Sequence, residues 1–121
     1  MNIDTFINDS NGVIQSNSRW GTVHVQNSIK TFTNAGTITN TGNLQPGTYI
    51  NVSAGVYLQE GLIETFTNSG LISGIMGLNL IKSTINTLIN TGIIESTSSN
   101  SLAAGISIAT LSGSPSTINN F

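Results

Sequence analysis

The ten residues IETFTNSGLI at positions 63–72 recur along this chain with few changes. Close copies are IKTFTNAGTI at positions 29–38 and INTLINTGII at positions 85–94. A looser copy covers positions 3–14, with two extra residues before its glycine, and positions 118–121 begin a fifth. Self-similarity at intervals of about 20 to 50 residues is typical of a solenoid, because one repeat cannot bury its apolar side alone.

A second, weaker phrase follows each copy and reads glycine, apolar residue, any residue, apolar residue. It occurs as GVYL at 55–58, GLNL at 77–80 and GISI at 105–108, and with one added residue as GTVHV at 21–25. Thr, Ile, Val and Phe favour strands, whereas Asn and Gly favour turns, and no stretch shows apolar residues at helical spacing. We predict an all-β parallel β-helix of about four to five coils, formed by residues 1–121 as one domain.

Equivalent side chains of a parallel β-helix lie above one another, about 4.8 Å apart. The aromatic position of the repeat predicts an apolar stack of Phe6, Phe32, Phe66 and Leu88. The asparagine position predicts an amide ladder of Asn8, Asn34, Asn68 and Asn90. Such a ladder satisfies buried carboxamides along the axis. The alternative is that each asparagine only tolerates a left-handed turn, but the glycine two residues later already supplies a permissive backbone.

The composition excludes several classes of function. Charged residues make up 7% of the chain and its net charge is −2, so we expect no nucleic-acid partner. The chain has no cysteine, which excludes disulfides and thiolate metal sites, and we expect no metal or cofactor. No apolar run is long enough for a membrane helix, and the first residues do not resemble a secretion signal. Membrane contact is therefore expected only through parts outside this segment.

The first residues already belong to a repeat and the last four begin another. Solenoids usually carry terminal caps that shield their open strand edges. We therefore expect a segment cut from a longer repeat array. The alternative is a self-assembling extracellular filament subunit whose copies associate end to end.

The repeats quoted above resemble those in passenger domains of Gram-negative autotransporter surface proteins, especially large ones rich in Asn, Ser and Thr. The resemblance implies a right-handed parallel β-helix that is secreted or displayed at the outer membrane of a bacterial cell. It also implies adhesin or toxin-like roles. We expect a non-enzymatic stalk or adhesin, with a protein or glycan of a host or neighbouring cell surface as its partner.

A binding region is predicted where the spacing between the two phrases is longest, from Ile38 to Gly55, because insertions in a solenoid form loops on one side. The candidate contact residues are Gln45, Tyr49, Tyr57 and Trp20. Two structural roles remain open as alternatives. Residues 49–52 alternate like a packed strand, and Trp20 can cover an open coil end.

Two further functions are weaker alternatives. A polysaccharide-degrading β-helix enzyme needs paired carboxylates, or calcium held by carboxylates. The acids occupy different positions of their repeats, which argues against this chemistry: Asp4, Asp9, Glu60, Glu64 and Glu95. An ice-binding solenoid would use outward ranks of threonine, but that array is interrupted. Its members are Thr31, Thr33, Thr65 and Thr67, flanked by Thr5 and Thr87, with Ile7 and Ile89 in place of the second threonine and Lys30 and Glu64 at its edge.

Overall fold

The computed structural model describes residues 2–43, 53–98, 103–109 and 115–121, and every regular element in these ranges is a β-strand. The strands form three parallel sheets. Sheet A contains β1 (Asn2–Asn8), β4 (Ser28–Asn34), β7 (Leu62–Asn68), β10 (Thr84–Asn90) and β13 (Thr117–Asn120). Sheet B contains β2 (Val13–Ser16), β5 (Thr37–Asn40), β8 (Leu71–Gly74) and β11 (Ile93–Ser96). Sheet C contains β3 (Gly21–Val25), β6 (Ala54–Gln59), β9 (Met76–Ile81) and β12 (Ala104–Ala109).

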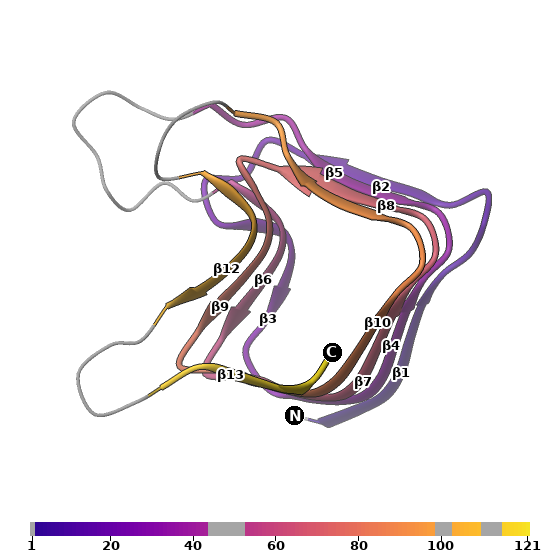
Figure 1. The fold of residues 1–121 in the computed structure, drawn as a ribbon. Coiled ribbons are helices and arrows are strands. Elements are labelled where there is room, and N and C mark those ends of the chain that lie inside the picture. Colours follow the sequence, from indigo (N-terminus) through magenta and orange to yellow (C-terminus); the bar gives the residue numbers. More distant parts are fainter. Residues whose placement is uncertain (1, 44–52, 99–102, 110–114) are drawn as a thin grey trace.

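The chain visits sheets A, B and C in turn, and each strand pairs with the strand three places along the sequence. Each passage through the three sheets is called a coil below. Four passages and the start of a fifth, β13, lie among the described residues. Viewed along the stack, the three sheets lie on three sides of one interior (Figure 1). The predicted all-β architecture of stacked parallel strands is confirmed, and the arrangement is consistent with a β-solenoid.

Repeats pair in the register that their sequences predict. Thr31 lies opposite Thr65, Phe32 opposite Phe66 and Asn34 opposite Asn68. The same register continues through β1 and β10. The pairing skips Lys30 and Glu64, both of which are exposed. This local break lets Ile29 and Phe32 both face the interior although an odd number of positions separates them.

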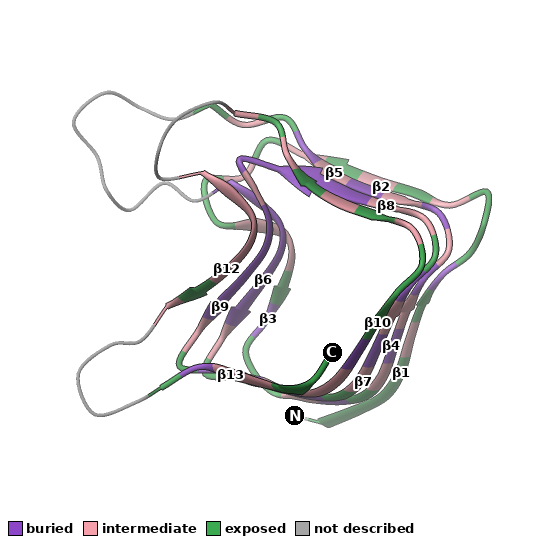
Figure 2. Ribbon diagram, viewed as in Figure 1, coloured by how far each residue is buried: buried purple, intermediate pink, exposed green. Residues whose placement is uncertain are grey.

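The interior is apolar and draws on all three sheets. Phe32 and Phe66 of sheet A, Ile38 of sheet B, and Leu58 and Leu78 of sheet C have no solvent exposure. Buried residues concentrate in the middle coils, whereas much of β1 at one end and of β12 at the other remains accessible (Figure 2). Because each fully buried Phe or Leu contributes about 1.5–3 kcal/mol, these apolar rows supply most of the favourable burial energy.

The repeat glycine between sheets A and B has a different role from the expected one. Gly36, Gly70 and Gly92 do not adopt a left-handed φ. Instead, a Cβ atom on Gly70 would overlap the carbonyl oxygen of Gly36 in the preceding coil. Glycine is needed here because successive bends stack backbone against backbone, leaving no room for a side chain. Left-handed backbone occurs elsewhere, at Glu60 and Lys82 after β6 and β9.

Candidate functional site

Asparagine side chains form a hydrogen-bonded ladder at the bend between sheets A and B. The Nδ2 atom of Asn8 donates to Oδ1 of Asn34, Asn34 donates to Asn68, and Asn68 donates to Asn90, each over 2.8 Å. Asn34 and Asn68 are fully buried. Each bond joins two coils, so the ladder connects all four coils directly through side chains.

The ladder asparagines also bind the backbone of their own bend and of the next coil. Asn68 Nδ2 lies 3.2 Å from the carbonyl oxygen of Gly70 and 3.1 Å from that of Ile93. Asn34 makes the equivalent contacts with Gly36 and Leu71, at 3.2 Å each. The side chain thus adds a second donor to the carbonyl oxygens of Gly36 and Gly70, which already accept the backbone N–H groups of Leu71 and Ile93.

The aromatic position forms a continuous stack inside sheet A. The rings of Phe6 and Phe32 have centroids 4.5 Å apart and an interplanar angle of 11°, and those of Phe32 and Phe66 are 4.5 Å apart at 8°. Leu88 follows Phe66 in the same row. Burial of each side chain in this stack stabilises the fold by more than one hydrogen bond does, because the net contribution of a hydrogen bond is only about 0.5–1.5 kcal/mol. The apolar row therefore contributes more stability, and the amide ladder is satisfied in the same register.

The other two bends are also polar inside, which the repeat did not predict. Asn40 is 1% exposed, and its Nδ2 donates to the carbonyl oxygens of Ser18, at 2.9 Å, and Ala54, at 3.0 Å. Ser83 accepts a bond from the backbone of Gly61 at 3.0 Å. Ser116 occupies the same position one coil later, and its Oγ accepts the backbone N–H of Ser83 at 3.1 Å. The sequence signal for these serines is STIN at 83–86, repeated at 116–119, whereas the asparagine at position 40 occurs in a single coil.

The outward side of sheet A carries the expected threonine ranks. Thr5, Thr31, Thr65 and Thr87 form one in-register row. In the second row, Thr33 and Thr67 lie between Ile7 and Ile89, which are 66% and 46% exposed. The second rank therefore ends in branched apolar side chains, and Lys30 and Glu64 remain exposed at the edge.

The predicted binding residues differ in whether the structure describes them and in how exposed they are. Gln45 and Tyr49 lie outside the described residues. Tyr57 is only 2% exposed, so the expectation that it offers accessible contact surface is wrong. Its side chain points outward from β6, between the inward-facing Val56 and Leu58, but packs in a cluster with Ala54, Met76 and Ile81.

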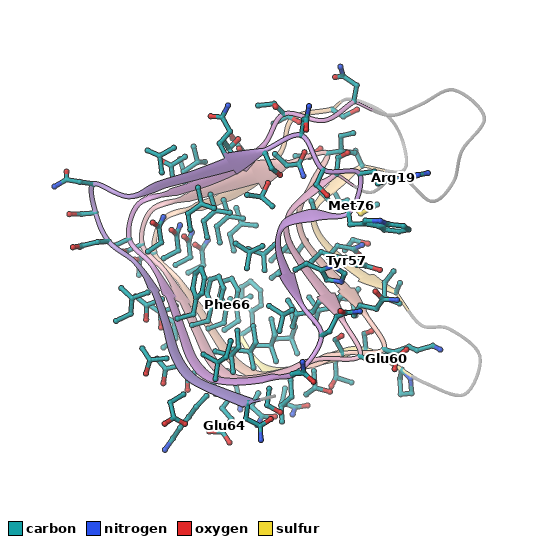
Figure 3. All side chains as sticks on the ribbon, turned by 180° about the vertical axis from the view of Figure 1, so that it is seen from behind. Arg19, Tyr57, Glu60, Glu64, Phe66 and Met76 are labelled. Carbon is teal, nitrogen blue, oxygen red and sulfur yellow. The ribbon has the colours of Figure 1, made fainter. Side chains whose placement is uncertain are left out.

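Arg19, Tyr57 and Met76 lie on the outer side of sheet C (Figure 3). The ring of Trp20 contacts that of Tyr57. Trp20 is 38% exposed, and its ring stacks on Tyr57 with a centroid separation of 6.2 Å. The Arg19 guanidinium carbon lies 5.6 Å from the Trp20 ring centroid, and the ring of the exposed His24 lies 4.7 Å from that of Tyr57. Arg19, Trp20, His24 and Tyr57 are called the outer aromatic cluster below. Its partly exposed indole and guanidinium form an amphipathic surface suited to contact.

The sequence predicted Trp20 and Tyr57 as contact residues. It did not predict that Arg19 and His24 lie beside them. A signal was present in the second phrase, because aligning GTVHV with GVYL places His24 opposite Tyr57. The contact between Trp20 and Tyr57 joins residues of neighbouring coils and depends on side-chain packing.

The part of the chain that is described holds no group of side chains of the kind that binds a metal ion. His, Asp and Glu side chains there do not gather in threes at a site that could hold a metal ion. In the same ranges, no helix is long and apolar enough to cross a membrane.

Tyr57 provides a titration test of this packing. Burial raises the pKa of the Tyr57 hydroxyl above its ordinary value of 10.0, because the phenolate would lose hydration. The contribution of Tyr57 to stability is therefore fully present below the pKa of the unfolded state. It is lost as the pH rises through the pKa of the folded state. The variant Tyr49→Phe leaves Tyr57 as the only tyrosine. Its tyrosinate absorbance should appear at higher pH in the native protein than in denaturant, and equal midpoints would contradict the burial of Tyr57.

Comparisons of the chain with models of protein families, with curated proteins and with solved structures found no match. The functional assignment therefore depends on the chain's own residues.

Proposed function

We propose that this chain is a stalk segment of a bacterial surface protein with a right-handed parallel β-helix, like the autotransporter passenger domains that its repeats resemble. Its role is mechanical and adhesive, not enzymatic. The stacked coils hold a contact region away from the cell, and the partner is a protein or glycan of another cell surface.

The observation that carries this proposal is the continuity of the amide ladder and the aromatic stack. Both rows follow the stacking direction from Asn8 to Asn90 and from Phe6 to Leu88. Bending such a rod opens one side, which separates stacked rings or lengthens the 2.8 Å amide bonds. These two rows along sheet A, together with the parallel strand pairing of sheets B and C, resist bending and make a stiff spacer.

The surface supports the same role. With 7% charged residues, Asn, Ser and Thr form the largest group among the exposed positions of the described residues, as in the exposed bends at Ser69 and Thr91. A solvated surface of this kind has few strong charges to steer it toward nucleic acid or anionic lipid. On sheet C, Arg19 and Trp20 of the outer aromatic cluster supply the contact surface for a protein or glycan.

An in-register tandem tests the stalk directly. Thr117 pairs with Thr84, and Asn2 occupies the same row of sheet A, so joining residues 1–116 to residues 2–121 of a second copy continues the repeat. We expect small-angle X-ray scattering to show one longer rod, extended by roughly 19 Å for four added coils. The measurement is made at concentrations where a single copy is monomeric.

The matched control joins residue 121 to residue 2, which shifts the register by five residues relative to the first fusion. This control should give two units at variable angles instead of one straight rod. If the in-register tandem is no longer or no straighter than the control, the stalk proposal is wrong.

A further inference from the structure

The amide ladder has a direction, and the two ends of the stack therefore differ. Every ladder bond runs from Nδ2 of one coil to Oδ1 of the next. Among the described residues, the only acceptor of Asn90 Nδ2 is the carbonyl oxygen of Gly92, at 3.3 Å, and no donor reaches Oδ1 of Asn8. One end thus offers an amide acceptor and the other an amide donor. They are complementary only when the first coil of one molecule follows the fourth coil of another.

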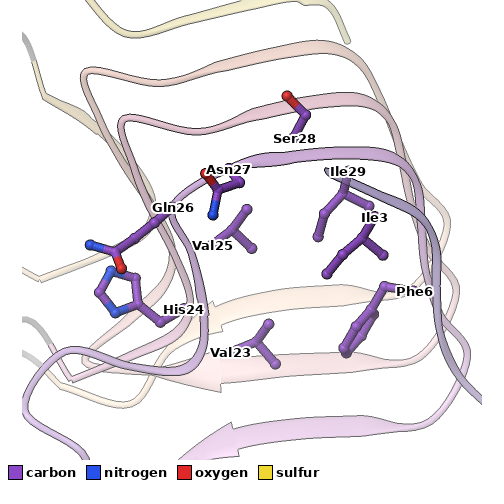
Figure 4. Close-up of a pocket in the computed structure, with 9 residues that line it drawn as sticks. All are labelled: Ile3, Phe6, Val23, His24, Val25, Gln26, Asn27, Ser28 and Ile29. Carbon is purple, nitrogen blue, oxygen red and sulfur yellow. The ribbon is translucent and has the colours of Figure 1, made fainter. Parts of the chain in front are cut away.

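The apolar rows match in the same orientation. Leu88 ends the row that begins with Phe6, and Ile108 ends the row that begins with Val25. Ile108 is 47% exposed although its row faces the interior in the middle coils. At the opposite end, a hollow of about 210 Å³ opens among Ile3, Phe6, Val23, Val25 and Ile29 (Figure 4). Stacking in this direction brings the apolar side chains of the fourth coil against the hollow.

The strand β13 occupies part of this end. Ile118 pairs with Ile85 and Asn120 with Thr87, which are the row positions of Ile3 and Thr5 in the first coil. Phe121, next to the aromatic row, is 82% exposed. β13 therefore occupies the position that β1 of an added copy would take. It pairs with β10 through fewer residues than β1 pairs with β4.

We propose that copies of this chain assemble head to tail, the first coil of one copy adding to the fourth coil of another, with β1 of the incoming copy displacing β13. Assembly extends the ladder by a bond from Asn90 to Asn8 of the next copy. This goes beyond the proposed stalk role, because it makes the rod a polymerising unit and makes β13 the element that restrains polymerisation.

Engineered cysteines test the orientation, since the natural chain has none. Val13 and Ile93 are 67% and 55% exposed and stand at the two ends of one row of sheet B. In the head-to-tail stack they lie on adjacent strands about 4.8 Å apart, within the range that a disulfide bridges. Under oxidation, the double variant Val13→Cys/Ile93→Cys should form a series of covalent oligomers, and each single variant should stay largely monomeric.

The control pair is Val13→Cys with Glu95→Cys. Glu95 is exposed and lies two residues farther along the same strand, beyond bridging distance of Val13 in the stack. Equal cross-linking of the two pairs would show random collision and overturn the proposal. Dimers of Val13→Cys alone would show head-to-head association and overturn it as well, as would the absence of oligomers from the matched pair.

Removal of β13 tests its restraining role. Sedimentation of residues 1–116 should show assembly at a concentration lower by about tenfold, the factor corresponding to 1.4 kcal/mol of competing contacts. Adding Asn90→Asp should abolish this gain, because the carboxylate keeps the acceptor for Asn68 but has no donor for Asn8. Ser69→Asp adds the same charge at an exposed bend of the third coil, away from both ends of the stack, and should leave assembly unchanged. Unaltered or weaker assembly of residues 1–116, with native circular dichroism, would refute the role of β13. If residues 1–116 do not fold, the cross-linking of the full chain decides the proposal.

Discussion

Replacing Gly70 with alanine is expected to lower the free energy of unfolding by about 3 kcal/mol. The added Cβ would overlap the carbonyl oxygen of Gly36 and lie 2.7 Å from the carbonyl group of Ala35. Both belong to the backbone of the preceding coil, which cannot yield as a flexible side chain would. The methyl group can be accommodated only by separating two coils, and this also stretches the bond from Asn34 to Asn68. Urea denaturation followed by circular dichroism measures the loss.

Two matched variants isolate the steric cause. Ser69→Ala changes the neighbouring exposed residue and should have little effect. Gly105→Ala places its Cβ 2.9 Å from one carbonyl oxygen, that of Ile94, with its next neighbours at 3.7 Å. It should therefore cost less than Gly70→Ala. If Gly70→Ala retains the stability of the natural chain, the close approach of the bends does not limit the side chain at this position.

Replacing Asn68 with leucine is expected to cost about 1–3 kcal/mol, because buried polar partners lose their bonds on both sides. Asn34 loses its acceptor and Asn90 loses its donor, each from a bond of 2.8 Å. The carbonyl oxygens of Gly70 and Ile93 lose the same donor. Leucine has the same side-chain branching as asparagine and is bulkier, so no cavity forms and lost hydrogen bonding is the main cause of the effect. The midpoint and slope of urea denaturation measure the change.

A comparison with Asn68→Asp separates bonding from packing. Aspartate has the same shape but no donor, and a carboxylate oxygen would face Oδ1 of Asn90. It should be at least as destabilising as leucine, whereas Asn27→Leu, at an exposed position, should be nearly neutral. Full stability of Asn68→Asp would show that the ladder bonds contribute nothing measurable.

The repeat pattern predicted the strands of sheet A, their parallel pairing and the four-residue rows of Asn and of Phe or Leu. These features are readable because each coil repeats the same local choice at the same position. A slip of one residue would turn Phe66 outward and Thr65 inward, so the register follows from the alternation itself. Asn40 is buried at another bend, but it occurs once and leaves no repeating signal. Ser83 and Ser116 are buried at the third bend and recur only in the short phrase STIN.

The roles of Gly70 and Tyr57 could not be predicted from the local sequence pattern. Gly70 was expected to supply backbone freedom, but it is needed because another coil's backbone passes close by. Tyr57 was expected to offer contact surface beside the longest insertion, but it is covered on the outer side of sheet C. Both outcomes depend on distances between segments that are far apart in sequence, which the local pattern does not contain.

The sequence by itself determined which residues stack on which, because identical side chains at a constant spacing satisfy their hydrogen-bonding and burial needs best when aligned with their own kind. Only the tertiary structure decided how the bends approach one another, which outward side chains are covered, and which way the amide ladder points. A carboxamide can donate in either direction along a row. Its direction, and with it the difference between the two ends of the stack, follows from the carbonyl groups that surround each asparagine in the assembled bend.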